Sequence, residues 1–341
     1  MNILVTGGTG YIGSHTIIEL LEDGHNVIVV DNLCNSTQES LKRVELITNT
    51  TIPFYEIDLC DKPRLEEVFK SNVIDAVIHF AGLKAVGESV AQPLKYYFNN
   101  INSTMVLLDA MQRYNVKKIV FSSSATVYGD PEELPLKETS RVGVGITNPY
   151  GQTKFMIEQI LRDLTVADPT FEVTLLRYFN PVGAHSSGTI GEDPNGVPSN
   201  LLPYIAQVAV GKLEYVRVFG DDYDTPDGTG VRDYIHVSDL ASGHVAAISH
   251  SKPGTHVYNL GTGKGTSVLE LINSFSMAAG KKIPYKIFDR RPGDIASCFA
   301  SPEKAHKELG WFAKKSIAQA CEDSWRWQSQ NPNGFKPNNN L

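Results

Sequence analysis

The feature that most constrains the fold is a regular alternation, along the first 180 residues, between short apolar runs and longer amphipathic segments. The runs predict strands at residues 3–6, 27–30, 54–57, 76–80, 118–122 and 173–176, and the segments predict helices at 11–22, 61–70, 94–114 and 150–165. Unbroken apolar runs are typical of strands that are buried on both faces. We therefore expect an α/β fold in which helices cover both faces of a doubly wound parallel sheet of the Rossmann type.

The pattern changes after about residue 180, where Gly and Pro interrupt residues 180–203 and 220–230. Helices are expected at 200–211, 238–249 and 268–279, separated by short strands. We expect a Rossmann domain over residues 1–180, to which later segments return, and a smaller mixed α/β lobe over 181–341. The polar stretch 331–341 is expected to be a frayed chain end.

Composition excludes several classes of protein. Apolar residues make up 41% and charged residues 20%, which is typical of a globular chain, and 31 basic residues against 38 acidic ones leave a net charge of −7. This balance argues against a nucleic-acid partner, so an anionic ligand would need backbone amides and a few placed arginines. There is no apolar run of the ~18 residues that a membrane span needs, and no leader-like N-terminus.

The cysteines and acidic residues do not predict a metal site. Four cysteines (Cys34, Cys60, Cys298 and Cys321) lack zinc-binding spacing and are expected to be free thiols of a cytoplasmic protein. The group His236, Asp239 and His244 is expected at a helix start and in the core. Pro226 interrupts the acidic residues 221–227, so they do not match a calcium loop.

A glycine-rich segment between the first strand and the first helix predicts a dinucleotide site. Gly7, Gly10 and Gly13 would make the turn, admit a pyrophosphate to the backbone, and let the helix pack on the strand. Asp31 ends the second strand, where a carboxylate accepts a ribose 2′-OH, and no arginine follows at 32–35. This favours NAD over NADP. The alternative is a Rossmann-like domain that binds no dinucleotide.

A tyrosine and a lysine one helical turn apart predict a general base. Tyr150 and Lys154 share one helix face, and a lysine ~4 Å away is expected to lower the tyrosine pKa from ~10 towards ~7. Ser124 lies at the carboxyl edge of the sheet, where open α/β sheets bind ligands. Alternatively, Ser124 is an ordinary turn residue. A second match to the spacing, Tyr114 and Lys118, falls where a helix ends and a strand begins, and is attributed to chance.

These motifs, with the segments HFAGLKAVGES at 79–89, FSSSATVYG at 121–129, RYFNPVGA at 177–184 and GTGVRDYIH at 228–236, resemble the UDP-hexose 4-epimerases. These enzymes form a branch of the extended short-chain dehydrogenase/reductase superfamily, and the similarity covers about residues 1–335. The resemblance implies an enzyme that converts UDP-glucose and UDP-galactose into each other through a 4-keto sugar and that uses tightly bound NAD. It also implies a homodimer.

The resemblance further implies a set of site residues. Beside the three glycines, NAD would contact Tyr11, Ile12, Asp31, Asn32, Leu33, Cys34, Asn35, Ser36, Asp58, Leu59, Phe80, Ala81, Gly82, Leu83, Lys84, Asn99, Ser124, Tyr150, Lys154 and Phe179. The UDP-sugar would contact Lys84, Ser124, Tyr150, Asn180, Asn200, Leu201, Arg232, Tyr234, Arg291, Asp294 and Cys298.

In this reading Tyr150, kept as phenolate by Lys154 and the nicotinamide charge, takes the proton of the sugar 4-OH while Ser124 bonds to that hydroxyl. Hydride passes from C4 to NAD, and the 4-keto sugar turns over and is reduced on its other face. Arg232 and Arg291 would hold the phosphates, with surface cations as the alternative.

Cys298 bears on substrate range. Narrow-specificity bacterial members carry a tyrosine there, and members with a small residue tend to accept N-acetylated UDP-sugars as well, so use of UDP-GlcNAc and UDP-GalNAc is expected. The alternative is a small buried thiol. Three rival functions are a sugar-nucleotide dehydratase, which would need a carboxylate pair that is absent beside Ser124, a simple dehydrogenase, which would release its cofactor, and a catalytically silent sugar-nucleotide sensor.

Overall fold

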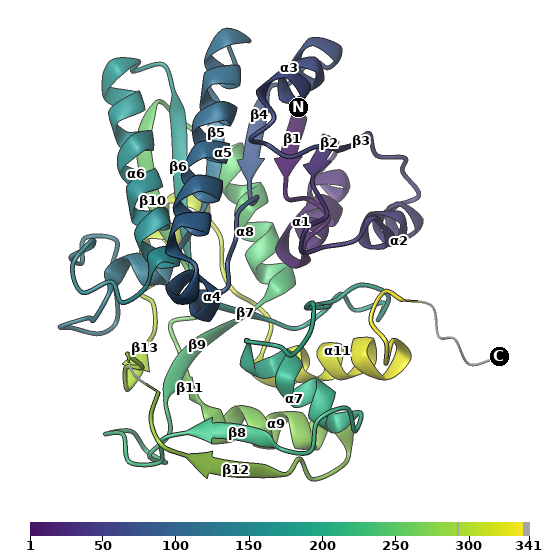
Figure 1. Ribbon diagram of the computed structural model, residues 1–341, viewed down its shortest axis with the longest axis vertical. Helices are drawn as coiled ribbons and strands as arrows, with labels where there is room; N and C mark the ends of the chain where they lie inside the picture. The colour runs from purple at the N-terminus through teal and green to yellow at the C-terminus, as the bar shows by residue number, and fades with distance from the viewer. Residues whose placement is uncertain (292, 337–341) are drawn as a thin grey trace.

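Seven parallel strands form the large sheet of the computed structural model, which describes residues 1–291 and 293–336 (Figure 1). In chain order they are β1 (Asn2–Thr6), β2 (Asn26–Asp31), β3 (Phe54–Glu56), β4 (Ala76–His79), β5 (Lys118–Ser124), β6 (Glu172–Tyr178) and β10 (Gly254–Leu260). The spatial order is β10-β6-β5-β4-β1-β2-β3. The order reverses between β1 and β4, which is where open α/β sheets leave a crevice for a ligand.

Helices cover both faces of this sheet because neighbouring side chains of a strand point to opposite sides. In β1, Ile3 and Val5 pack into one core and Leu4 into the other. The first core is completed by α1 (Tyr11–Glu22), α2 (Gln38–Thr48), α8 (Val237–Ser249) and α10 (Glu303–Leu309). The second is completed by α3 (Lys62–Ser71), α5 (Pro93–Arg113) and α6 (Pro149–Ala167). The predicted doubly wound fold is confirmed.

A smaller mixed lobe lies beside the carboxyl edge of the sheet (Figure 1). Its main sheet joins β7 (Asn180–Val182), β9 (Val231–His236), β11 (Gly265–Ser267) and β13 (Ser297–Cys298), and a separate pair joins β8 (Val216–Phe219) and β12 (Tyr285–Phe288). The helices α7 (Leu201–Ala209), α9 (Val268–Ala279) and α11 (Ile317–Gln330) share a third core. The short helices α4 (Val86–Ala91) and η1 (Ala125–Tyr128) carry loops at the sheet edge.

The helices and strands predicted with bounds are present within a few residues. The helices α2, α4, α10 and α11 were not predicted, and β10 was expected only as a short strand without bounds between two helices. Both β10 and α8 return to the large sheet after the chain has already formed β7, so residues beyond 180 complete the first core. In the part of the chain that the structure describes, no helix has the length and apolar character to cross a bilayer.

The expectation of a frayed end is wrong for residues 331–336. Asn331 exchanges hydrogen bonds with Arg43 and Gly188, and Phe335 packs against Trp327 with ring centroids 4.9 Å apart. These long-range contacts order the segment although its composition is polar. The rest of that stretch, 337–341, lies outside the described residues.

Candidate functional site

The glycine segment turns at the amino end of α1 because side chains are excluded there. Gly7 has φ +71°, and a Cβ on it would lie 2.7 Å from the Ala81 backbone nitrogen. A Cβ on Gly13 would lie 2.4 Å from the Gly7 carbonyl oxygen, so only glycine lets α1 approach β1 this closely. Gly10 caps α1 without a side-chain bond. The first-turn amides therefore face an open cradle that fits a pyrophosphate.

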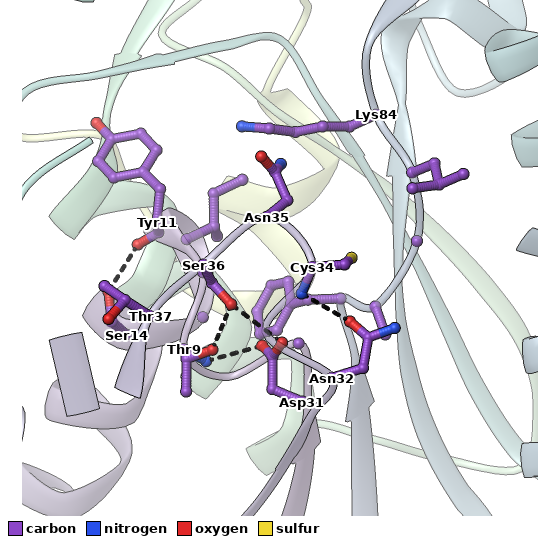
Figure 2. A pocket seen from close by; sticks show the side chains of 18 of the residues that line it. Thr9, Tyr11, Ser14, Asp31, Asn32, Cys34, Asn35, Ser36, Thr37 and Lys84 are labelled. Atoms are coloured by element: carbon purple, nitrogen blue, oxygen red, sulfur yellow. Dashed lines mark hydrogen bonds between the residues drawn. The ribbon is translucent and has the colours of Figure 1, made fainter. Parts of the chain in front are cut away.

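One cavity of about 850 Å³ starts at this cradle and follows the carboxyl ends of the central strands (Figure 2). All the predicted cofactor residues line it except Leu33, Ser124 and Phe179. Leu33 instead donates its backbone N–H to Asp31, Ser124 follows the lining residue Ser123, and Phe179 packs in a separate apolar cluster. The size and lining fit a dinucleotide.

Asp31 is oriented by hydrogen bonds from its own loop and from the glycine segment (Figure 2). One carboxylate oxygen accepts from the Thr9 backbone N–H at 3.2 Å, and the other accepts from the Leu33 N–H at 2.9 Å and from the Ser36 hydroxyl at 3.1 Å. The carboxylate is buried and lines the cavity, so it is placed to accept from a ribose hydroxyl.

Tyr150 and Lys154 line the other end of the cavity, and Ser124 lies next to Tyr150. Ser124 ends β5, and its hydroxyl accepts from the Thr126 N–H at 3.2 Å. Tyr150 lies in the first turn of α6, where the Asn148 side chain accepts the Gly151 N–H at 2.8 Å. The Asn148 cap thus fixes the start of α6 and, with it, the position of Tyr150 near the end of β5.

The predicted lowering of the Tyr150 pKa by Lys154 is wrong for this arrangement. The Lys154 Nζ donates to the Ser122 carbonyl at 2.6 Å and lies 5.9 Å from the centre of the Tyr150 ring. Burial raises the pKa of the Tyr150 phenol, which the Ser124 side chain partly opposes, and burial lowers the pKa of Lys154 to about 7. Shared helix face brings the two residues together, but the lysine reaches past the ring to the β5 backbone.

The small lobe gathers most of the predicted substrate residues around β9. Arg232 and Tyr234 point to one side of this strand, Asn180 pairs with Tyr234, and Cys298 pairs with Arg232. Burial raises the pKa of Tyr234 to about 12, although the nearby guanidinium groups of Arg232 and Arg291 act in the opposite direction. The guanidinium groups of Arg232 and Arg291 therefore both lie near the Tyr234 phenol.

The Asp294 carboxylate already accepts a hydrogen bond from the Arg291 Nε at 2.9 Å, so it is not a free acceptor. The pair lies on the loop before β13, and both side chains keep part of their surface exposed. Leu201 opens α7 and packs partly against the third core.

Glu192 joins the two parts of the site and was missed in the sequence. It accepts a hydrogen bond from the Asn200 side chain at 2.8 Å and lies 3.6 Å from the Lys84 ammonium, with only 9% of its side chain exposed. Lys84 lines the cavity and Asn200 caps α7. No local signal marks Glu192, since it stands in an irregular loop. Thr9, Ser14, Thr37, Glu39, Arg43 and Phe335 also line the cavity without having been predicted.

The histidines considered as ligands take structural positions. His236 caps α8 by accepting the Ser238 N–H, and His244 is buried against Tyr178. Tyr114 and Lys118 do not share a helix face, because the first caps α5 and the second begins β5. Among residues 1–291 and 293–336, no three or more His, Cys, Asp or Glu side chains form a group able to hold a metal.

Comparison with known proteins agrees with this geometry. Residues 3–261 match the NAD dependent epimerase/dehydratase family. The UDP-glucose 4-epimerase of Bacillus subtilis is 63% identical, over 98% of this chain and 99% of that protein. The crystal structure of UDP-glucose 4-epimerase from Bifidobacterium longum in complex with NAD⁺ and UDP is 61% identical, with a TM-score of 0.96, and covers 98% of this chain and 100% of that one. The UDP-Glc/GlcNAc 4-epimerase of Campylobacter jejuni is 36% identical, with a TM-score of 0.84, over 96% and 99% of the two chains.

Proposed function

The chain belongs to the NAD dependent epimerase/dehydratase family, and from this premise we propose that it converts UDP-glucose and UDP-galactose into each other. The observation that carries the proposal is one cavity that runs from the glycine cradle to Tyr150 and Lys154. The small lobe adds Arg232 and Arg291 close to Tyr234, which suits a second diphosphate.

Within this proposal each group has a chemical task. NAD, when bound, supplies a hydride acceptor and a positively charged ring that favours a phenolate nearby. Tyr150 takes the proton of the sugar 4-OH and later returns it, and Ser124 holds that hydroxyl. Lys154 supports the end of β5 through the Ser122 carbonyl and contributes a charge that its pKa of about 7 makes adjustable near neutrality. Because the sugar is oxidised and then reduced, the overall reaction is redox-neutral.

The other predicted substrate residues would position the nucleotide and the sugar. Arg232 and Arg291 are proposed to bind the phosphates, with Lys84, Asn180, Asn200, Leu201, Tyr234 and Asp294 lining the rest of the path. The Glu192 contacts with Lys84 and Asn200 support this arrangement, since they hold a cavity residue and a lobe residue together.

The test is to incubate the purified protein, without added NAD, with UDP-galactose and to measure UDP-glucose by chromatography. Tyr150→Phe should lower turnover at least ~100-fold, because a general acid–base group contributes that much or more. Tyr114→Phe is the matched control, since it removes the same hydroxyl from the other tyrosine of this spacing and should leave turnover unchanged. Equal activity in the two variants would sink the assignment of Tyr150.

We further propose that the site accepts UDP-GalNAc and UDP-GlcNAc. Cys298 packs beside the cluster of Phe179, Tyr128 and Leu136, and the small side chain at this position supports the proposal because it would obstruct an acetamido group less than a tyrosine would. Cys298→Tyr should cut turnover of UDP-GalNAc strongly while sparing UDP-galactose, and Cys298→Ser serves as the control of unchanged size. A loss of equal size on both substrates contradicts the proposal.

A homodimer and a cytoplasmic location complete the proposal. Exposed apolar side chains follow α5, with Leu94 69% and Phe98 73% exposed, and Met156 continues the surface on α6. Two copies of this surface would bury each other's apolar side chains. Phe98→Glu should convert a dimer into a monomer in light scattering, and an unchanged mass refutes the surface. The four cysteines are free thiols, which supports a reducing compartment.

A further inference from the structure

The C-terminal segment, residues 331–336, forms a wall of the cavity that begins at the glycine cradle. Phe335 and Lys336 line this cavity together with Arg43 of α2 and the loop residues Asp193 and Asn195. Asp31 and the loop after β2 line the same cavity, and α2 follows that loop directly, so Arg43 and the wall stand on the side where Asp31 would hold a ribose. The chain after α11 rises next to α2 in Figure 1.

Arg43 fastens the segment to the Rossmann domain. Its Nη1 donates to the Asn331 side chain at 2.7 Å and to the Thr189 carbonyl at 2.9 Å, and its Nε donates to Glu39 at 3.0 Å. The guanidinium also lies 5.0 Å from the centre of the Phe335 ring. One side chain of α2 therefore holds a segment almost 300 residues later through hydrogen bonds and a cation–π contact.

A second anchor involves the loop before α7. The Phe335 backbone N–H donates to the Asp193 carboxylate at 2.9 Å. Gly334 has φ +67°, and a Cβ added to it would lie 2.0 Å from the Asp193 carboxylate. A side chain at 334 would therefore force the Asp193 carboxylate or the segment to move, and the positive φ adds backbone strain, so this anchor would be weakened.

We propose that this segment retains the dinucleotide, with Phe335 and Arg43 acting as residues that slow its release from the adenosine end of the cavity. The inference rests on the proposed function. A reaction that oxidises and reduces the same sugar never needs to exchange its cofactor, so closure of the cavity costs nothing in turnover. Release then requires that residues 331–336 leave their anchors, and weakening either anchor should speed release.

The test measures exchange of bound NAD for added NADH by NADH fluorescence, on full-length protein. Phe335→Ala removes the aromatic part of the wall, and Gly334→Ala displaces the segment without removing any of its side chains. Both should exchange at least ~10-fold faster than wild type, and activity lost on dilution should return when NAD is added. Phe312→Ala is the control, because Phe312 is an exposed phenylalanine that stacks on His306 and does not line the cavity.

The possible results separate this inference from the proposed function. Exchange within two-fold of wild type in both variants overturns the retention role, as does a loss of activity that NAD does not restore while exchange stays slow. Wild-type protein that binds neither NAD nor NADH contradicts the proposed function itself. Faster exchange in both variants, with the control unchanged, supports the assignment.

Discussion

Replacing Glu158 by Gln should destabilise the protein strongly, because it leaves a buried cation without its partner. The Glu158 carboxylate on α6 accepts from the Arg177 Nε at 3.0 Å and Nη2 at 2.7 Å, and from the Ser123 hydroxyl at 2.6 Å. Side-chain exposure is 0% for Glu158 and 1% for Arg177. Glutamine keeps the shape of the side chain, so the experiment removes the charge and little of the packing.

Burial sets the magnitude. Removing one partner of a buried ion pair costs about 3–5 kcal/mol, whereas an exposed pair is worth about 0–1 kcal/mol. Arg177 keeps a bond to the Tyr128 hydroxyl at 3.0 Å, which places the expected loss at the lower end, about 3 kcal/mol. With a urea m-value of about 3 kcal/mol/M for a chain of this size, the unfolding midpoint should fall by about 1 M.

The assay is urea unfolding of Glu158→Gln and of a matched control, Glu172→Gln. Glu172 of β6 pairs with Lys118 of the neighbouring strand β5 at 3.2 Å, but about a quarter of each side chain is exposed. The control should shift the midpoint by less than about 0.3 M, which corresponds to 1 kcal/mol. A shift of similar size in both variants would refute the reasoning that burial makes the Glu158 pair essential. Glu158→Gln should also lower turnover, because Ser123 adjoins Ser124 and Glu158 follows Lys154 by one turn.

Two further substitutions test the site. Gly13→Ala puts a Cβ 2.4 Å from the Gly7 carbonyl oxygen, so NAD affinity should fall at least ~10-fold in a titration, whereas Gly87→Ala, with open space around its Cβ, should bind normally. Lys154 has its pKa lowered by burial to about 7, against ~10.5 in the unfolded chain. The unfolded state therefore binds more protons between pH 7 and 10.5, and the free energy of unfolding of ligand-free protein should rise with pH across that window. In Lys154→Met this rise should disappear from urea unfolding measured at pH 7 and 9.5, and an identical pH dependence in both proteins contradicts the assigned burial.

Much of the fold follows from local features of the sequence. Apolar runs and amphipathic segments specify backbone conformation within a few residues, so the strands before residue 180 and helix α1 were predicted close to their observed bounds. The glycine cradle was also predictable, because the requirement for glycine at 7 and 13 comes from contacts made by the local backbone and the adjoining strand ends. The pairing of Tyr150 with Lys154 was predictable only as a shared helix face.

The tertiary structure decided everything that depends on residues distant in sequence. The i,i+4 spacing does not determine which acceptor a flexible lysine reaches. Because α6 packs against β5, the Lys154 ammonium donates to the Ser122 carbonyl rather than to the Tyr150 phenol. Composition predicted a frayed end, yet Arg43 holds residues 331–336 against the cavity across 288 positions of sequence. Glu192 likewise reaches Lys84, more than 100 residues earlier in the chain, only when the small lobe packs against the large sheet. Sequence patterns determine backbone conformation because those forces act over a few residues, whereas the partner of a side chain depends on how whole elements pack.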